Sequence, residues 1–291
     1  MSWEPEVKEI KKRHALAFQM GGKEGIARQR KRGKLTARER IDALADPKSW
    51  KEFLTLVGKG TYQNGELTEF TPKPSVEGLA KIDGRKVIVN AGDFTVRGGS
   101  AGSRSGSGHE LSASQRALEW RLPYIRLLDA AGGSVRTFEE YGRTYLPDGN
   151  HRAIHDVQLL SLVPVVSAVL GSVAGLPAIN ACLAHFNVMV KGMSQLFPGG
   201  PPVVKAALGY DITKEDLGGD QIHTRLSGCV DNLAETEADA FSQIRKFLSY
   251  LPNNVYQMPP RGPQTDDPNR AMKSCCRSYR AIDGIRLMES N

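Results

Sequence analysis

The chain has 291 residues, of which 40% are hydrophobic and 24% charged, and its formal net charge is +7. This balance excludes an intrinsically disordered chain and provides for one large or two small domains. Residues 159–183 carry no charge, but two prolines, Pro164 and Pro177, divide them. We therefore expect two buried strands with turns there, rather than a membrane helix.

Helix and strand signals alternate along the chain, which predicts an α/β protein with a largely parallel central sheet. Helical signals occur from residue 176 onward and in residues 5–31, 35–46, 111–119, 152–161, 203–208, 212–217 and 232–250. The expected strands are residues 76–82, 87–96, 122–128, 163–170 and 186–190. Residues 57–71 are expected to form a loop or an edge strand, and residues 137–151 a loop.

Short local signals predict where individual elements begin and turn. Thr36 precedes a helical stretch and Glu39 follows three residues later, which is the spacing of a capping box. Asp83 and Gly84 separate two apolar runs and are typical of a β-hairpin turn. The glycine pair at positions 21 and 22 interrupts the first helical stretch.

Much of the positive charge lies in residues 8–40. The basic side chains of this segment include Lys11, Lys12, Arg13, Lys23, Arg28, Arg30, Lys31, Arg32, Lys34, Arg38 and Arg40. The segment is interpreted as a solvated helix surface, as a site for an anionic ligand such as a nucleotide phosphate, or as a nucleic-acid site. The nucleic-acid interpretation ranks last, because aromatic residues do not alternate with the basic ones.

The cysteines indicate a reducing, cytoplasmic location. The chain contains no C-x-x-C pair, and Cys275 and Cys276 lack the partner spacing of a metal site. Cys182 and Cys229 lie among apolar or small residues, so we expect them to be buried thiols.

Two apolar strands run into turns of small residues, at residues 124–136 and 162–186. Small side chains leave backbone N–H groups uncovered, and such groups can stabilise the oxyanion of a thioester carbonyl without a catalytic side chain. No phosphate-binding loop and no Ser–His–Asp pattern stands out in the sequence.

Five segments occur in the order found in biotin-dependent acyl-CoA carboxyltransferases. They are KLTARERIDALADP (34–47), DFTVRGGSAG (93–102), DAAGG (129–133), GSVAG (171–175) and LGGDQIHTRLSGCVD (217–231). The chain thus resembles the β subunits of propionyl-CoA, acetyl-CoA and methylcrotonyl-CoA carboxylases. The resemblance implies a crotonase-like (ClpP/crotonase) fold, a ββα superhelix, and it covers the acyl-CoA-binding N-terminal domain only.

The resemblance divides the chain into three parts. Residues 1–33 form a basic helical extension, residues 34–262 the carboxyltransferase N-terminal domain, and residues 263–291 a linker with an aberrant tail. The resemblance is expected to end at Asn269. A one-base shift of the reading frame over residues 271–280 yields a sequence similar to the family's interdomain linker, so we expect a frameshift there.

The resemblance also implies a site made largely of main chain. The N–H groups of Gly175 and Leu176 are expected to form the oxyanion hole. The family usually has two glycines here, so Leu176 and Pro177 are expected to narrow the acyl pocket. The residues expected to bind acyl-CoA are Gly98, Gly99, Ser100, Gly132, Gly133, Ser134, Lys34 and Arg38. Solvated surface charge is an equal alternative for the last two. We expect His185 and His223 to be structural.

The implied function is that of a carboxyltransferase component. It binds acyl-CoA and stabilises the enolate for carboxylation by carboxybiotin on a separate carrier, without a metal in this subunit. Expected partners are a biotin carboxylase and biotin carrier subunit, a separately supplied C-terminal half, and further copies in a hexamer; no nucleic acid or membrane is expected. Two alternatives stay open: a noncatalytic acyl-CoA-binding or assembly scaffold, and a subunit of a biotin-dependent decarboxylase. A stand-alone hydratase is disfavoured, because residues 129–136 and 171–180 contain no glutamate.

Overall fold

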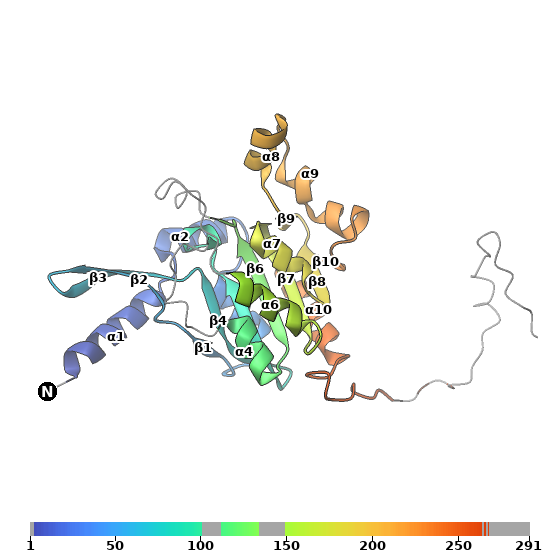
Figure 1. The fold of residues 1–291 in the computed structure, drawn as a ribbon, viewed down its shortest axis with the longest axis horizontal. Coiled ribbons are helices and arrows are strands. Elements are labelled where there is room, and N and C mark those ends of the chain that lie inside the picture. Colours follow the sequence, from blue (N-terminus) through green and yellow to red (C-terminus); the bar gives the residue numbers. More distant parts are fainter. Residues whose placement is uncertain (1–2, 101–111, 134–148, 264, 266, 268–291) are drawn as a thin grey trace, which may run out of the picture. The chain divides into compact units, whose positions relative to one another are not determined.

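The structure, a computed structural model, describes residues 3–100, 112–133, 149–263, 265 and 267, with the backbone alone for residues 149–153. It divides into two units, Met1–Pro259 and Pro260–Asn291. The first unit holds all the helices and strands of the described residues (Figure 1).

An eight-stranded mixed sheet forms the centre of the first unit, in the order β1-β4-β5-β6-β7-β8-β10, with β9 paired to β7. The strands are β1 (Lys51–Phe53), β4 (Ser75–Ile82), β5 (Arg85–Gly92), β6 (Tyr124–Ala130), β7 (Val165–Ala174), β8 (Phe186–Val190), β9 (Gln195–Phe197) and β10 (Asn232–Ala234). The first three of these pair antiparallel, and every pair from β5 onward is parallel. The predicted parallel core is therefore confirmed.

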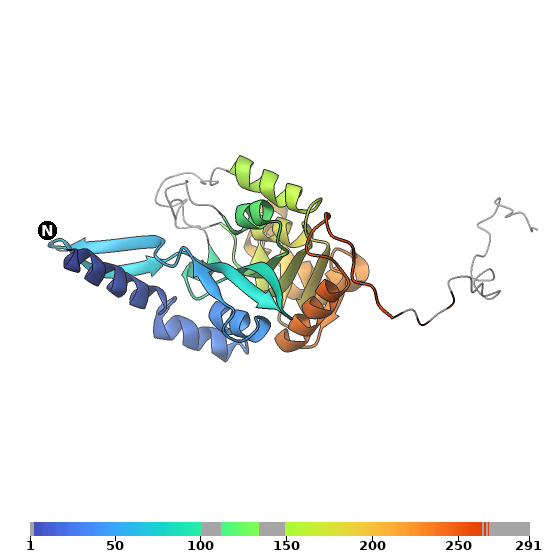
Figure 2. The same ribbon diagram turned by 90° about the horizontal axis from the view of Figure 1, so that it is seen from below.

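Helices cover both faces of this sheet (Figure 2). The helices are α1 (Glu4–Ala17), α2 (Gly22–Lys31), α3 (Ala37–Leu44), α4 (Ala113–Trp120), α6 (Gly149–Leu159), α7 (Leu176–Cys182), α8 (Pro201–Leu208), α9 (Lys214–Gly218) and α10 (Glu237–Ser249), with a 3-10 turn η1 (Arg97–Gly99) and a π-helix η2 (Ile222–Leu226). Helices α3 and α10 share one core cluster with the sheet, α4 and α6 share a second, and α7 a third.

Strand β7 shows why the apolar run in this region is uncharged. Val166 and Leu170 pack on the side of α3 and α10, whereas Val165 and Val169 belong to the two other clusters. Alternating side chains point to opposite faces, so a strand buried on both faces reads as continuously apolar. None of the described helices combines the length and the apolar character needed to cross a bilayer.

Two expectations from the sequence were wrong in detail, and that for residues 57–71 was incomplete. The apolar run contains one strand, β7, and not two, whereas the helical signal from residue 176 onward is confirmed by α7. Residues 57–71 form most of a separate hairpin of β2 (Gly58–Gln63) and β3 (Glu66–Pro72), which lies beside α1 (Figure 2). Residues 232–250 are not one helix, because the first three form β10 at the edge of the sheet. The expected loop at 137–151 lies largely outside the described residues, and its end begins α6.

The predicted capping box at the start of α3 is confirmed. The Thr36 hydroxyl accepts a hydrogen bond from the Glu39 N–H (3.3 Å), and the Glu39 carboxylate accepts one from the Thr36 N–H (2.8 Å). Burial alone would raise the pKa of Glu39, but hydrogen bonds from Thr36 and the Arg30 guanidinium outweigh it and hold the pKa below its usual range.

We predict that Glu39→Gln lowers the unfolding free energy at pH 7 and that this deficit shrinks as the pH falls. A carboxylate whose pKa is depressed by folding stabilises the native state above its unfolded pKa, and this contribution is lost on acidification. Urea denaturation of both proteins between pH 7 and pH 3 measures the difference. A deficit that is equal at every pH would contradict the ionic role of Glu39.

Candidate functional site

The glycine turns that follow β5, β6 and β7 meet at one edge of the sheet. A side-chain carbon at Gly99 would lie 2.6 Å from the carbonyl oxygen of Asp129, and one at Gly132 would lie 2.9 Å from that of Ala174. The Ala131 N–H donates to the carbonyl oxygen of Gly98 (2.8 Å). The carboxyl ends of neighbouring parallel strands share an edge, and this places the turns together. We call Gly98, Gly99, Gly132, Gly133 and Gly175 the glycine corner.

Glycine is required at two positions of this corner by the backbone itself. Gly132 has φ +87° and Gly175 has φ +68° with ψ −137°, conformations that residues with a side chain rarely adopt. A side-chain carbon at Gly175 would lie 3.6 Å from the Cα of Gly132, so the second and third turns lie in contact distance.

The N–H group of Gly175 is not free to bind an oxyanion in this structure. It donates to the carbonyl oxygens of Phe197 (3.2 Å) and Pro198 (3.1 Å). The reason is that β9 pairs with the end of β7, so this N–H continues the hydrogen bonding of the sheet. The oxyanion role expected for Gly175 stays a prediction, which requires this N–H to leave its two carbonyl partners.

The N–H group of Leu176, unlike that of Gly175, has no carbonyl partner in the described part of the chain. Leu176 is the first residue of α7, where backbone N–H groups have no intrahelical partner. Pro177 has no N–H, and the N–H groups of Ala178 and Ile179 donate to the carbonyl oxygen of Gly175. The Leu176 side chain is half exposed at this edge.

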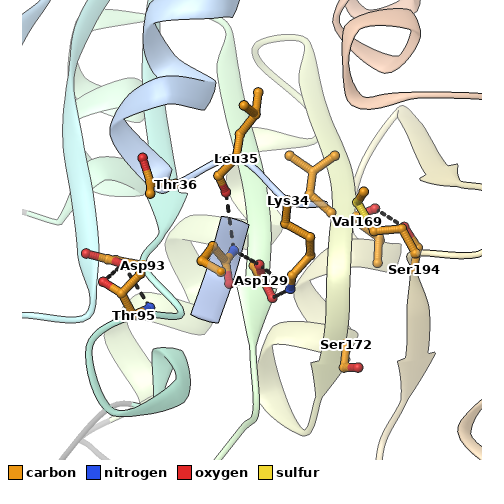
Figure 3. A network of polar contacts seen from close by, with 12 residues as sticks. Lys34, Leu35, Thr36, Asp93, Thr95, Asp129, Val169, Ser172 and Ser194 are labelled. Carbon is orange, nitrogen blue, oxygen red and sulfur yellow. Dashed lines mark hydrogen bonds and ion pairs between the residues drawn. The ribbon is translucent and has the colours of Figure 1, made fainter. Parts of the chain in front are cut away.

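A buried cluster of charges lies next to the corner, and Figure 3 shows its Lys34–Asp129 pair. The Lys34 ammonium contacts both carboxylate oxygens of Asp129 (2.7 and 2.9 Å), and Arg40 reaches the same carboxylate (3.1 Å). Arg40 also pairs with Glu237 (2.8 Å) and donates to the carbonyl oxygen of Leu170 (2.7 Å). We call Lys34, Arg40, Asp129 and Glu237 the buried charge network.

The two predicted phosphate ligands are occupied elsewhere. Lys34 is only 7% exposed, and burial lowers the pKa of its ammonium against the opposing pull of Asp129. The Arg38 guanidinium pairs with Glu52 and lies over the Phe18 ring, 3.9 Å from its centre. Both side chains are paired with carboxylates of the chain itself, and their expected role as phosphate ligands stays a prediction.

Instead, three other arginines surround a hollow beside Gly98. Arg28 lies in α2, Arg32 directly follows that helix, and Arg97 lies in η1; all three are exposed, and none of them forms an ion pair within the described residues. The hollow measures about 340 Å³ and is lined by Gly25, Arg28, Gln29, Arg32, Phe94, Thr95, Arg97 and Gly98. We call it the arginine pocket. Arg28 and Arg32 belong to the basic segment seen in the sequence, whereas Arg97 lies outside it, and its signal is its place directly before the first glycine turn.

The remaining predicted residues fall into separate groups. Ser100 is buried at the end of η1, and Ser134 lies outside the described residues. His185 and His223 are structural, as expected: each ring is hydrogen-bonded to backbone, His185 at Val165 and Leu160 and His223 at Leu196.

Cys182 and Cys229 are exposed free thiols, so the expected burial was wrong. They lie at the end of α7 and in a surface loop.

Within the described residues, no three His, Cys, Asp or Glu side chains are grouped so that they could hold a metal ion. The absence of a metal from this subunit stays a prediction.

We predict that Gly132→Ala destabilises the fold by about 1–3 kcal/mol, whereas Gly133→Ala is nearly neutral. The new methyl group at Gly132 meets the fixed carbonyl of Ala174, and the residue must keep a positive φ. At Gly133 the added carbon meets nothing within 4 Å in the described part of the chain. Thermal denaturation of the matched pair tests the corner, and equal loss in both variants would contradict this geometry.

Residues 28–282 match the carboxyl transferase domain family. The match begins before residue 34 and continues past Asn269, where the resemblance was expected to end; the three-part division of the chain and the frameshift stay predictions. The chain is 34% identical to the carboxyltransferase subunit of propionyl-CoA carboxylase from Haloferax mediterranei, covering 93% of this chain and 52% of the relative. It is 33% identical to methylmalonyl-CoA decarboxylase subunit alpha from Veillonella parvula, covering 87% and 49%.

Solved structures of this family share the fold. A hexameric transcarboxylase 12S with methylmalonyl-CoA bound matches at a TM-score of 0.76 and 28% identity, over 92% of this chain and 51% of that one. The β subunit of P. aeruginosa geranyl-CoA carboxylase matches at 0.66 and 25% identity, over 89% and 46%. The expected crotonase-like carboxyltransferase fold is confirmed, and the chain spans about half the length of the relatives it matches. The chain belongs to the carboxyl transferase domain family, with carboxyltransferase subunits of acyl-CoA carboxylases among its relatives.

Proposed function

We propose that this chain is the acyl-CoA-binding part of a biotin-dependent carboxyltransferase. The observation that carries the proposal is the position of the arginine pocket directly beside the glycine corner, with Gly98 belonging to both. An acyl-CoA is a thioester joined to a phosphorylated nucleotide, so it needs a place for a carbonyl oxygen and a place for several phosphates. A transcarboxylase of the same fold has been solved with methylmalonyl-CoA bound.

At the thioester end, the chain offers main-chain donors rather than reactive side chains. The Leu176 N–H lies at the start of α7, where a helix favours negative charge, and it is the donor that we assign to the thioester oxygen. The α-proton would pass to the ureido group of biotin after that group has released CO2, as the family resemblance implies. The charge then moves onto the thioester oxygen as the enolate forms, so the hydrogen bond strengthens during the reaction. Carboxybiotin, brought by a separate carrier, supplies the carboxyl group; no residue described in this chain is assigned to it.

At the nucleotide end, guanidinium groups supply the attraction. Arg28, Arg32 and Arg97 are exposed and converge on one hollow, and guanidinium groups bind phosphate oxygens in pairs of hydrogen bonds. Acyl-CoA phosphates are therefore a better fit for this part of the basic segment than a merely solvated surface.

The complete reaction requires partners that we propose from the family. They are a biotin carboxylase with its biotin carrier, a C-terminal carboxyltransferase half, and further copies of this chain. We also propose a cytoplasmic location, because free thiols persist in reducing compartments and Cys182 and Cys229 are free.

A second candidate function is a noncatalytic acyl-CoA-binding scaffold. The observation that favours it is the Gly175 N–H, which the chain's own carbonyls occupy, so that one of the two expected oxyanion donors is missing. This scaffold would bind the thioester but give no turnover when carrier, carboxylase and C-terminal half are supplied, whereas the carboxyltransferase would give carboxylated product. A decarboxylase subunit would act on the carboxylated thioester instead.

We predict that propionyl-CoA binds the chain and that Arg28→Gln/Arg97→Gln weakens this binding by about tenfold or more, as expected when charged hydrogen bonds are lost. A ligand at 100 times its dissociation constant stabilises the folded state by about 2.7 kcal/mol, so thermal shift detects it. The matched control is Lys31→Gln, which removes an exposed charge of α2 that does not line the pocket.

The salt dependence of the same binding provides a second readout. Affinity for phosphates held by exposed arginines falls as ionic strength rises, and the double variant should show a shallower slope. An unchanged affinity in the double variant, or equal losses in it and the Lys31 control, would remove the arginine pocket from the proposal.

A further inference from the structure

We infer that Lys34 and Asp129 are positioning residues that hold the arginine pocket and the glycine corner at a fixed distance from each other. One CoA thioester can then bind the pocket with its phosphates and the corner with its thioester at the same time. This inference rests on the function proposed above. It concerns side chains that contact neither end of the ligand but form the wall between them.

On the pocket side, the pair touches two residues that line the hollow. The Gln29 side-chain amide donates to Asp129 (2.9 Å) and to the carbonyl oxygen of Leu35 (3.2 Å), and Gln29 is 3% exposed. The Lys34 ammonium lies 4.8 Å from the centre of the Phe94 ring. The pair is therefore bonded to one pocket-lining residue, Gln29, and packed against another, Phe94.

On the corner side, the main chain of Asp129 supports the first and second turns. Side-chain carbons at Gly92 and Gly99 would lie 3.0 and 2.6 Å from its carbonyl oxygen, so these glycines lie directly against it. Asp129 is the penultimate residue of β6, where the pairing with β7 shifts its register, and the second glycine turn follows that strand. Asp129 thus contacts the first glycine turn through its backbone and the pocket-lining Gln29 through its carboxylate.

Strand β7 is shaped to admit this pair. A side-chain carbon at Gly171 would lie 2.2 Å from Asp129 Oδ1 and 2.5 Å from Lys34 Nζ. Gly171, the first glycine of the GSVAG segment, therefore leaves space for the buried ion pair and does not belong to the glycine turn at Gly175.

The charges suggest a variant that removes the pair without leaving a buried charge alone. Lys34 and Arg40 face Asp129 and Glu237, two positive against two negative groups. Lys34→Met/Asp129→Asn removes one charge of each sign, and Arg40 keeps its contacts with Glu237 (2.8 and 3.1 Å). Removing a single member would leave an uncompensated buried charge, which is strongly destabilising.

The test compares two ligands, adenosine 3′,5′-bisphosphate for the nucleotide end and propionyl-CoA for both ends, by titration calorimetry on the full chain. In the wild type, propionyl-CoA should bind more tightly. In Lys34→Met/Asp129→Asn, the nucleotide should keep its affinity within about twofold, while most of the additional affinity of propionyl-CoA is lost, about tenfold. A loss of equal size for both ligands, or none, overturns the inference.

Two further variants accompany the test, one as a control and one as a replacement. Lys73→Met/Glu77→Gln removes another largely buried ion pair (2.9 Å), which lines neither the pocket nor the corner, and both ligands should bind it as they bind the wild type. If the first variant does not fold, Lys34→Gln/Asp129→Asn replaces it, because it removes the same two charges and leaves polar side chains at both positions. The same selective loss is expected there, and an equal loss for both ligands again overturns the inference.

The outcome also separates this inference from the proposed function. A wild type that binds the nucleotide but gains nothing from the acyl end contradicts the thioester site itself. A wild type that gains affinity, with a variant that retains it, contradicts only the positioning role.

Discussion

The buried charge network is the constraint on which the rest of this structure depends. Lys34 and Arg40 come from the N-terminal helical region, Asp129 from the end of β6 and Glu237 from the start of α10. These charges lie almost entirely out of water, where each is tolerable only because its partner is in place, and breaking such a pair costs about 3–5 kcal/mol. The network thereby fixes α2 and α3 against the sheet. It adds to the contact at the start of α2, where the Gly21 N–H donates to the Thr95 hydroxyl (2.9 Å).

The site that results is made mostly of main chain. Three parallel strands bring their glycine turns to one edge, and the positive φ of Gly132 and Gly175 permits a contact that side chains would prevent. The short strand β9 then uses the Gly175 N–H for its own pairing. The corner is left with the Leu176 N–H and an exposed leucine side chain at its mouth. Under the proposed function, the Leu176 N–H would bind the thioester oxygen and stabilise the enolate alone, whereas the family resemblance implied two N–H donors.

Much of the fold could be predicted from the sequence, because its signals are local. The apolar runs of β6, β7 and β8 are buried on both faces, and Thr36 and Glu39 are spaced as a capping box. The site could be predicted only in part. Which N–H groups are free depends on β9, a three-residue strand without a periodic pattern. The burial of Lys34 depends on Asp129, 95 positions away, and Arg97 joins Arg28 only through the tertiary fold.

The most direct test of the account is the backbone amide resonance of Leu176 while propionyl-CoA is titrated into isotope-labelled protein. A hydrogen bond from this N–H to the thioester oxygen should move the Leu176 amide proton to lower field. The Gly175 amide, already bonded to Phe197 and Pro198, should move much less. Changes confined to the arginine pocket, with Leu176 unmoved at saturating ligand, would contradict the proposal that the glycine corner binds the thioester.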